Sequence, residues 1–259
     1  MRAKKSYGQH FLTNELVAAE IAASLDLSDD CNTVVEVGPG KGMLTKYLMK
    51  NDYRLIPVEA DRDMVAYLGK HYPELKDKIV EQDFLKVNLR DIVGDEQFAI
   101  IGNFPYNISS QILFKMVEYK EQVPELVGMF QKEVAERVAA PHGSKTYGVI
   151  SVLIQAYYDA SLLIEVDRYN FDPPPKVQSA VIRLQRKPSL DIKCDPRLFR
   201  TIVKQAFGQR RKMLRNTMKS FLKGSELLQE PFFRQRPEQL SVADFIDLTN
   251  LVQDFTVKD

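Results

Sequence analysis

The most specific chemical signal in this 259-residue sequence is the run Asn103, Phe104, Pro105 and Tyr106. The Asn103 side-chain oxygen and the Phe104 main-chain carbonyl are two acceptors that could bind both hydrogens of the adenine amine, localising its lone pair for attack on a methyl donor. Pro105 restricts Phe104 to extended backbone geometry and offers no competing N–H. Tyr106 could stack on the base, which is worth about 1–3 kcal/mol. The run predicts methyl transfer driven by positioning, with no general base required; the alternative is a tight turn that only begins the next helix.

A glycine-rich turn supplies a candidate site for the methyl donor. Gly38, Gly40 and Gly42 follow a strand-like apolar run, with Glu36 two residues before the first glycine. Glycines let the backbone approach a ligand closely at the start of a helix. The spacing Gly-x-Gly-x-Gly departs from the Gly-x-Gly-x-x-Gly of dinucleotide folds. Since any tight strand-to-helix turn could use such glycines, the turn is weak evidence by itself.

Acidic residues follow the next two strand-like runs. Glu59 could accept hydrogen bonds from both ribose hydroxyls of an adenosyl group, Asp83 could bond the adenine amine, and Phe84 could pack on the adenine ring. Glu59 could instead be a solvated acid, and Asp61 is a competing acid nearby. Because ligands bind at the carboxyl ends of successive strands in open α/β sheets, the combination predicts an S-adenosylmethionine site, with S-adenosylhomocysteine as product.

Alternating apolar runs and helical periodicities predict the elements that position these residues. Strands are expected at residues 33–37, 54–58, 79–81, 98–101, 126–130, 151–156 and 180–184, and helices at 15–25, 43–50, 63–71, 110–119 and 133–139. This alternation predicts an α/β doubly wound sheet. After residue 187 only helical spacing remains, at residues 196–223 and 237–255. We therefore expect a catalytic domain over residues 1–186 and a small all-helical, RNA-binding domain over residues 187–259.

The formal net charge of +1 hides an uneven distribution, because residues 197–223 contain nine basic residues and no acidic one. On a continuous helix, the basic side chains recurring every four residues would form one stripe: Arg211, Arg215, Lys219 and Lys223. The N-terminus adds Arg2, Lys4 and Lys5. A solvated face is the usual meaning of such a stripe, but the lack of any acid favours a polyanionic partner.

Other classes of function have little support in the sequence. The two cysteines and three histidines are scattered, which argues against a metal site or a redox pair. Hydrophobic residues make up 44% and charged residues 27%, as in a soluble protein. No apolar run approaches the roughly 20 residues that cross a bilayer, and no signal-peptide core follows the basic N-terminus. We expect a cytoplasmic protein with no membrane partner.

Several runs, in order along nearly the whole chain, resemble the ribosomal RNA adenine dimethyltransferase family. They are residues 8–12, 36–40, 59–61, 82–83, 103–109, 171–180 and 206–216. The resemblance implies a Rossmann-like class I methyltransferase sheet of seven strands, the last antiparallel, followed by a helical domain. It also implies N6-dimethylation of two adjacent adenosines near the 3′ end of small-subunit (16S) ribosomal RNA, in a pre-30S particle, by a monomer linked to subunit biogenesis.

The resemblance further implies roles for individual residues. His10, Leu12 and Asn103 would contact the cofactor, although the apolar residues after His10 could equally be a lead-in to the first helix. Phe171 would face the target base opposite Tyr106, whereas by itself it is more typical of a core residue. The RNA-binding residues would be Lys176, Arg210, Arg211, Lys212, Arg215 and Lys219.

Four other functions remain open. A large-subunit ribosomal RNA methyltransferase of the antibiotic-resistance type shares the 103–106 run, but the basic segment 209–216 favours the small-subunit substrate. A DNA adenine methyltransferase would be expected to carry an additional target-recognition domain. A non-catalytic ribosome-assembly factor on the same scaffold would not need an intact 103–106 run. A nicotinamide oxidoreductase would bind a different cofactor.

Overall fold

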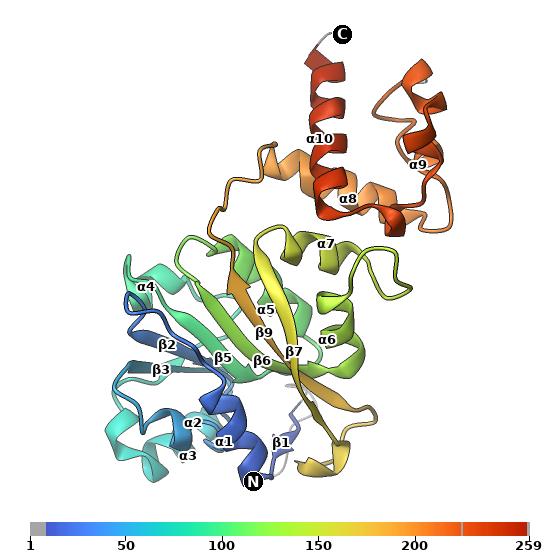
Figure 1. Ribbon diagram of the computed structural model, residues 1–259. Helices are drawn as coiled ribbons and strands as arrows, with labels where there is room; N and C mark the ends of the chain where they lie inside the picture. Colours follow the sequence, from blue (N-terminus) through green and yellow to red (C-terminus); the bar gives the residue numbers. More distant parts are fainter. Residues whose placement is uncertain (1–8, 224, 258–259) are drawn as a thin grey trace. The chain divides into compact units, whose positions relative to one another are not determined.

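Seven strands form one mixed sheet among the residues that the computed structural model describes, 9–223 and 225–257 (Figure 1). Its order is β4-β3-β2-β5-β6-β9-β7. The strands are β2 (Thr33–Val37), β3 (Arg54–Glu59), β4 (Val80–Glu81), β5 (Ala99–Asn103), β6 (Glu125–Gln131), β7 (Tyr158–Val166) and β9 (Ser179–Arg186). The pairs from β4 through β6 are parallel, and β9 runs antiparallel to β6. The predicted sheet, with an antiparallel last strand, is confirmed.

Helices surround this sheet (Figure 1). They are α1 (Glu15–Ala23), α2 (Thr45–Leu48), α3 (Arg62–His71), α4 (Leu89–Val93), α5 (Ser109–Glu118) and α6 (Lys132–Ala139), with 3-10 turns at Pro73–Leu75 and Arg168–Asn170. Every residue of β2 is buried, as expected for a central parallel strand covered on both faces. The predicted helix over residues 43–50 is shorter than expected, because residues 41–44 still belong to the glycine turn.

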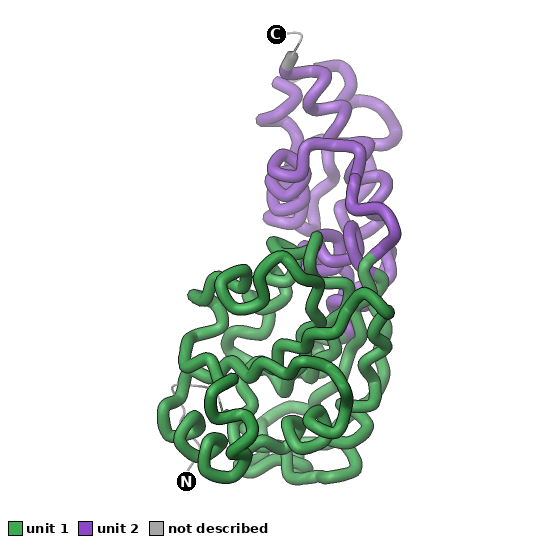
Figure 2. The backbone as a smooth tube through the Cα atoms, turned by 90° about the vertical axis from the view of Figure 1, so that its left-hand side faces the viewer, with its two compact units in different colours: residues 1–135, 159–186 green, residues 136–158, 187–259 purple. Residues whose placement is uncertain are grey.

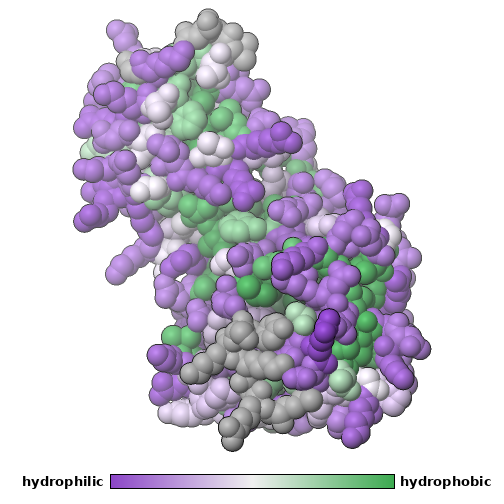
Figure 3. All heavy atoms as spheres, turned by 180° about the vertical axis from the view of Figure 1, so that it is seen from behind, coloured by the Kyte–Doolittle hydropathy of each residue, from purple (hydrophilic) through white to green (hydrophobic). Residues whose placement is uncertain are grey.

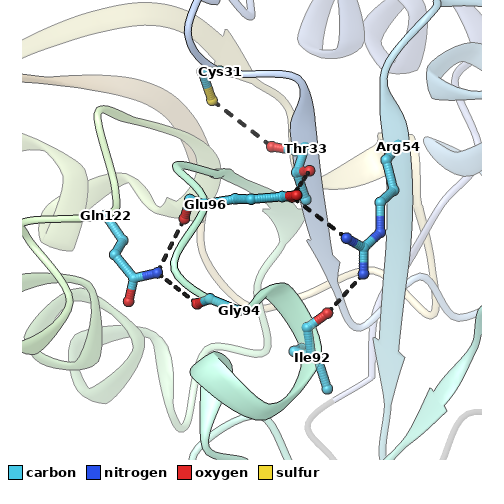
Figure 4. Close-up of polar contacts among 7 residues, drawn as sticks. All are labelled: Cys31, Thr33, Arg54, Ile92, Gly94, Glu96 and Gln122. Atoms are coloured by element: carbon cyan, nitrogen blue, oxygen red, sulfur yellow. Dashed lines mark hydrogen bonds and ion pairs between the residues drawn. The ribbon is translucent and has the colours of Figure 1, made fainter.

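A polar network closes the amino ends of the central strands (Figure 4). The Glu96 carboxylate accepts from Thr33 Oγ1 at 3.3 Å and from Arg54 at 3.4 Å, and Arg54 also donates to the Ile92 carbonyl at 2.8 Å. Gln122 Nε2 donates to the carbonyls of Gly94 and Glu96 at 2.9 and 3.0 Å. These bonds tie the loop before β5 to the first residues of β2 and β3. The glycine turn predicted from the sequence lies at the opposite end of β2.

The chain divides into two compact units (Figure 2). Residues 1–135 and 159–186 form the first, and residues 136–158 and 187–259 form the second. The second holds α7 (Val149–Gln155), α8 (Pro196–Gly208), α9 (Leu214–Thr217) and α10 (Val242–Val257), with 3-10 turns at Glu226–Gln229, Pro231–Arg234 and Pro237–Gln239. The structure therefore differs from the expected division at residue 186 by adding residues 136–158 to the C-terminal helices.

The prediction of a strand at residues 151–156 is wrong. The helix found there belongs to the second unit, which is why the boundary between the units differs from the expected one. This segment is helix α7, which contacts α8, and its Ile150, Val152, Leu153 and Ile154 are all buried. A short run that is apolar on every side cannot be assigned to strand or helix by periodicity. Ser151 Oγ accepts from the Gly148 N–H at 2.9 Å and so helps to begin the helix. The edge strand β7, which follows α7, has no counterpart among the strands predicted from the sequence.

The prediction of one continuous basic helix over residues 196–223 is also wrong. Helix α8 ends at Gly208, residues 209–213 form a turn, and α9 is four residues long. The Leu214 N–H donates to the Gln235 carbonyl at 2.8 Å, which draws the chain out of the line of α8. Arg211, Arg215, Lys219 and Lys223 are exposed but do not form a stripe on one helix. Arg2, Lys4, Lys5 and Gly8 lie outside the described residues.

Apolar side chains are mostly interior, and the face in Figure 3 is largely hydrophilic, with smaller apolar areas between. None of the helices in the described part of the chain is both long enough and apolar enough to cross a membrane.

Candidate active site

A cavity of about 280 Å³ lies at the carboxyl ends of β2, β3, β4 and β5. It lies wholly within the first unit, and residues from the segment around β1 (Phe11–Leu12) complete its wall. The structure brings most of the predicted cofactor and catalytic residues together in its lining: His10, Leu12, Gly38, Gly40, Glu59, Asp83, Phe84, Asn103, Phe104, Pro105 and Tyr106. The cavity is of the size typical of small-molecule sites.

The glycine turn needs its glycines for two separate reasons. Gly40 has φ +56°, and a side chain there would place its Cβ 3.2 Å from the Phe11 ring. At Gly42, with φ +80°, a Cβ would lie 2.4 Å from the Tyr72 ring, whose hydroxyl donates to the Gly42 carbonyl at 3.1 Å. The left-handed backbone and the close aromatic rings both exclude larger residues. The Phe11 and Tyr72 rings thus pack directly on the backbone of the turn whose Gly38 and Gly40 line the cavity.

Glu59 is the acid that lines the cavity, and Asp61 is not part of the lining. The Glu59 carboxylate is 6% exposed and accepts from the N–H groups of Gly40 at 3.1 Å and Asp61 at 2.9 Å. Burial raises the pKa of Glu59, although these two bonds lower it. Asp61 instead caps α3 through the Asp63 N–H at 3.0 Å and accepts from Gln9 Nε2 at 3.0 Å. Glu59 therefore lines the cavity, whereas the Asp61 carboxylate is engaged at the start of α3 and by Gln9.

Glu36 is a buried acid in the same lining, and its position before the glycine turn predicted no contact for its side chain. It is 1% exposed, and Thr45 Oγ1 donates to its carboxylate at 2.7 Å. Burial raises the pKa of Glu36 to about 8. Glu36 therefore holds its proton to higher pH than an exposed glutamate does, next to the glycine turn.

Asp83 and Phe84 lie on a single turn after β4. The Asp83 carboxylate accepts from the Leu85 N–H at 2.9 Å, and the Asp83 carbonyl accepts from the N–H groups of Lys86 and Val87 at 2.9 and 3.0 Å. Phe84 is 3% exposed and lines the cavity. The turn thus holds a carboxylate and an aromatic side chain side by side, as an adenine ring would require.

Asn103 ends β5, and its side-chain amide is oriented by the N-terminal segment. Nδ2 donates to the His10 carbonyl at 3.0 Å, which leaves Oδ1 as the side-chain atom able to accept from a ligand. The His10 contact therefore helps to select which end of the amide serves the expected target amine. Sequence reasoning could not find this bond, because its partners are 93 positions apart.

The ring of Phe104 is buried in a slot between two glycines. Gly102 of β5 lies opposite Gly128 of β6, and the ring packs edge-on against Phe130 with centroids 5.0 Å apart. The Phe104 N–H donates to the Met129 carbonyl at 3.2 Å. This anchorage fixes the main chain that carries the expected second acceptor.

Tyr106 is held from two sides. Its hydroxyl lies 2.6 Å from Ser179 Oγ, and its ring stacks on the His10 imidazole with centroids 5.4 Å apart. His10 Nδ1 lies 2.8 Å from the Pro173 carbonyl, to which it donates as Nδ1–H. Ser179 is fully buried and was not predicted as a site residue. The structure thus shows contacts for the His10 side chain as well as for its backbone.

Phe171 is the exception among the predicted catalytic residues. It pairs with Leu12 in the two-stranded sheet of β1 and β8 (Phe171–Asp172), is 3% exposed, and packs in the apolar core. It is not part of the cavity lining. Phe171 therefore occupies a core position beside its strand partner Leu12, and the expectation that it faces the target base stays a prediction.

The predicted RNA-binding residues belong to both units. Lys176 is exposed in the first, and Arg211, Lys212, Arg215 and Lys219 are exposed in the second. Arg210 differs from them, because its guanidinium donates to the carbonyls of Ser144 at 3.3 Å and Lys145 at 2.5 Å. Arg210 therefore also organises the loop before α7.

Comparisons with known proteins extend these observations. The model of the family described as ribosomal RNA adenine dimethylase matches residues 1–254. A protein of Flavobacterium johnsoniae named Ribosomal RNA small subunit methyltransferase A is 51% identical over 253 residues, covering 98% of this chain and 97% of its own. One of Cytophaga hutchinsonii with the same name is 51% identical, covering 97% and 98%.

Solved structures share the fold at lower identity. A dimethyladenosine transferase from Plasmodium falciparum has a TM-score of 0.80 at 24% identity and covers 95% of this chain and 98% of its own. The 23S rRNA methyltransferase ErmE has a TM-score of 0.67 at 22% identity, covering 93% and 99%. Both support a Rossmann-like fold.

Proposed function

The chain belongs to the ribosomal RNA adenine dimethylase family, and from this premise we propose that it uses S-adenosylmethionine to dimethylate N6 of two adjacent adenosines near the 3′ end of small-subunit ribosomal RNA. The single observation that carries the proposal is the shared cavity, in which Asn103, Phe104 and Tyr106 lie with the glycine turn, Glu59 and Asp83. Its relatives at 51% identity are named as small-subunit enzymes.

The residues around the cavity fit an adenosyl cofactor. The Gly40 backbone offers close approach, the Glu59 carboxylate can accept from ribose hydroxyls, and the Asp83–Phe84 turn can bind the edge and face of adenine. When bound, S-adenosylmethionine supplies an electrophilic methyl group on a sulfonium. His10 and Leu12 close the same cavity from β1 and its flank.

The target amine is then held by the run 103–106. Asn103 Oδ1 and the Phe104 carbonyl accept its two hydrogens, and Tyr106 stacks on the base. In-line orientation would lower the barrier to forming the N–C bond while the S–CH3 bond of the sulfonium breaks, leaving S-adenosylhomocysteine. The nitrogen would then lose its proton to water, so that no side chain needs to act as general base. An adenine within a helix would have to leave its stack to reach this position.

RNA is held by the exposed basic residues of the two units. Lys176, Arg211, Lys212, Arg215 and Lys219 would contact phosphates, which position the substrate without reading its sequence. Arg210 would act mainly by shaping the loop at Ser144 and Lys145, because its guanidinium already donates to their carbonyls. We assign the RNA-binding role to Lys176 and to residues 187–259 together with this loop. We also propose that the substrate is a pre-30S particle in the cytoplasm and that the protein acts as a monomer.

The test replaces Asn103 by alanine and measures transfer of labelled methyl groups to purified small subunits, followed by mapping of the modified bases. Turnover should be abolished, while RNA binding stays close to that of the wild type. Asn51→Ala, at an exposed asparagine beyond α2, is the matched control and should leave turnover unchanged. Unchanged turnover in Asn103→Ala would remove the basis for the mechanism. Absence of turnover in the wild type would instead favour a non-catalytic assembly factor.

Large-subunit RNA is the second candidate substrate, because the ErmE structure shares the fold. The same labelled assay with separated large and small subunits decides between them. Label found in the large subunit alone would overturn the small-subunit assignment.

A further inference from the structure

Lys115 is a buried lysine that the proposed mechanism does not use. It lies in α5, the helix that follows the run 103–106, and is 8% exposed. Its Nζ donates a hydrogen bond to the Val87 carbonyl. The same Nζ lies 5.4 Å from the centroid of the Phe84 ring and 5.9 Å from that of Tyr119. Lysine is almost never buried without partners, so this arrangement needs a reason.

The groups around Nζ offset part of the cost of its burial. Burial lowers the pKa of Lys115, while the carboxylates of Glu118 and Asp83 raise it again. The aromatic faces of Phe84 and Tyr119 also favour a nearby cation. Asp83 and Phe84 are the two residues proposed to receive the adenine end of the cofactor.

Lys115 binds the end of the turn that begins with Asp83 and Phe84. The turn begins at Asp83, whose carbonyl accepts from the N–H groups of Lys86 and Val87. It ends at Val87, whose carbonyl accepts from Lys115. Tyr119, one helical turn after Lys115, accepts from the Leu89 N–H at 3.2 Å and donates to Asn88 Oδ1 at 3.0 Å. Helix α5 therefore clamps residues 83–89 by side chains rather than by strand pairing.

We propose that Lys115 is a positioning residue for cofactor recognition, which holds the Asp83–Phe84 turn in register with the cavity through Val87 and the Phe84 ring. The inference rests on the proposed use of S-adenosylmethionine. Because α5 starts directly after the run 103–106, the same helix connects the adenine-binding turn to the loop that holds the target amine. Lys115 touches neither ligand and acts through Val87 and Phe84.

The test is Lys115→Met, which keeps a long apolar stem and removes the ammonium. The KM for S-adenosylmethionine and the calorimetric Kd for S-adenosylhomocysteine should each rise by about tenfold, the order expected when a hydrogen bond from a charged group is lost. The kcat at saturating cofactor should change by less than about twofold. Preference for S-adenosylhomocysteine over its inosine counterpart should also shrink, since the displaced Asp83 no longer reads the adenine amine.

Lys86→Met is the matched control. Lys86 lies on the same turn, with its side chain 84% exposed and its Nζ 3.9 Å from Asp83. It should leave Kd and base preference within about twofold of the wild type. Lys115→Arg should recover part of the affinity, because it restores a charged donor. If Lys115→Met does not fold, Lys115→Gln, which removes the charge but keeps a donor, should still raise KM by more than Lys86→Met does.

The outcomes separate the two proposals. If the wild type binds no S-adenosylhomocysteine, the proposed function fails and this inference with it. If the wild type binds but Lys115→Met has the same KM, Kd and base preference, only the role of Lys115 is overturned. A fall in kcat without a rise in KM, or an equal effect of Lys86→Met, would also overturn it.

Discussion

Replacing Gly128 by alanine should displace the loop that holds the target amine, although residue 128 is not part of the cavity lining. A Cβ at this position would lie 2.0 Å from Phe104 Cε2 and 2.8 Å from its Cδ2 and Cζ. The ring cannot simply move away, because Gly102 and Phe130 lie against it and a Cβ at residue 102 would be 2.7 Å from Cε1. The clash must therefore be relieved by shifting Phe104 and its main chain.

The expected loss of stability in Gly128→Ala follows from overpacking of the core around the Phe104 ring. Inserting a methyl group into a tightly packed core costs about 1–3 kcal/mol. At about 2–4 °C per kcal/mol for a unit of this size, the melting temperature should fall by roughly 2–12 °C. The Phe104 carbonyl is the proposed acceptor for one amine hydrogen, and a shift on the order of 1 Å can cost about a hundredfold in rate. We expect kcat to fall by about ten- to a hundredfold.

Thermal unfolding and single-turnover methyl transfer measure the two effects. Gly69→Ala is the control, because this glycine lies in α3 and a Cβ there would meet only Lys76 Cγ at an ordinary 3.6 Å. That variant should be neutral or more stable by up to about 1 kcal/mol. Adding Phe104→Leu to Gly128→Ala should recover part of the loss, since the smaller side chain makes room. The reasoning is refuted if Gly128→Ala melts with the wild type and turns over within about twofold of it.

Three further predictions concern the polar groups of the site. Tyr106→Phe keeps the ring but leaves the fully buried Ser179 hydroxyl without this partner. The free energy of unfolding, measured with denaturant, should fall by about 1–3 kcal/mol, and adding Ser179→Ala should restore part of it. Strictly additive effects of the two substitutions would contradict this. For Glu36, the folded pKa of about 8 exceeds the ordinary glutamate pKa of 4.5, so the folded state binds more protons between these values. Its stability therefore falls as pH rises from 4.5 to 8. Glu36→Gln should flatten that dependence in unfolding measured from pH 5 to 8, and an unchanged slope would count against the assignment. Glu59→Gln should weaken S-adenosylhomocysteine binding by roughly ten- to a hundredfold in calorimetry, as for lost hydrogen bonds to a charged group, and an unaltered Kd would exclude Glu59 as the ribose acceptor.

Local sequence patterns were sufficient where helical periodicity or a glycine-rich turn at its end marks the element. The apolar run of β2 and the amphipathic α3 were predicted nearly to their ends. Prediction failed where an apolar run is buried on every side, as in α7, and where an edge strand exposes residues on both faces, as in β7. It also failed at residues 209–213, where a long-range bond from Leu214 to Gln235 overrides helical spacing.

The sequence by itself determined which residues could bind the cofactor and the target amine. This was possible because residue type and position after each strand are local properties. They predicted the glycine turn, Glu59, Asp83 and the Asn103–Tyr106 run, and all of them line one cavity. Only the tertiary structure decided how each part is held: Asn103 by the His10 carbonyl, Tyr106 by Ser179, and the Asp83 turn by Lys115. These partners come from distant segments, and strand pairing likewise moved Phe171 into the core. Contacts of this kind depend on the packing of whole elements, which no local spacing encodes.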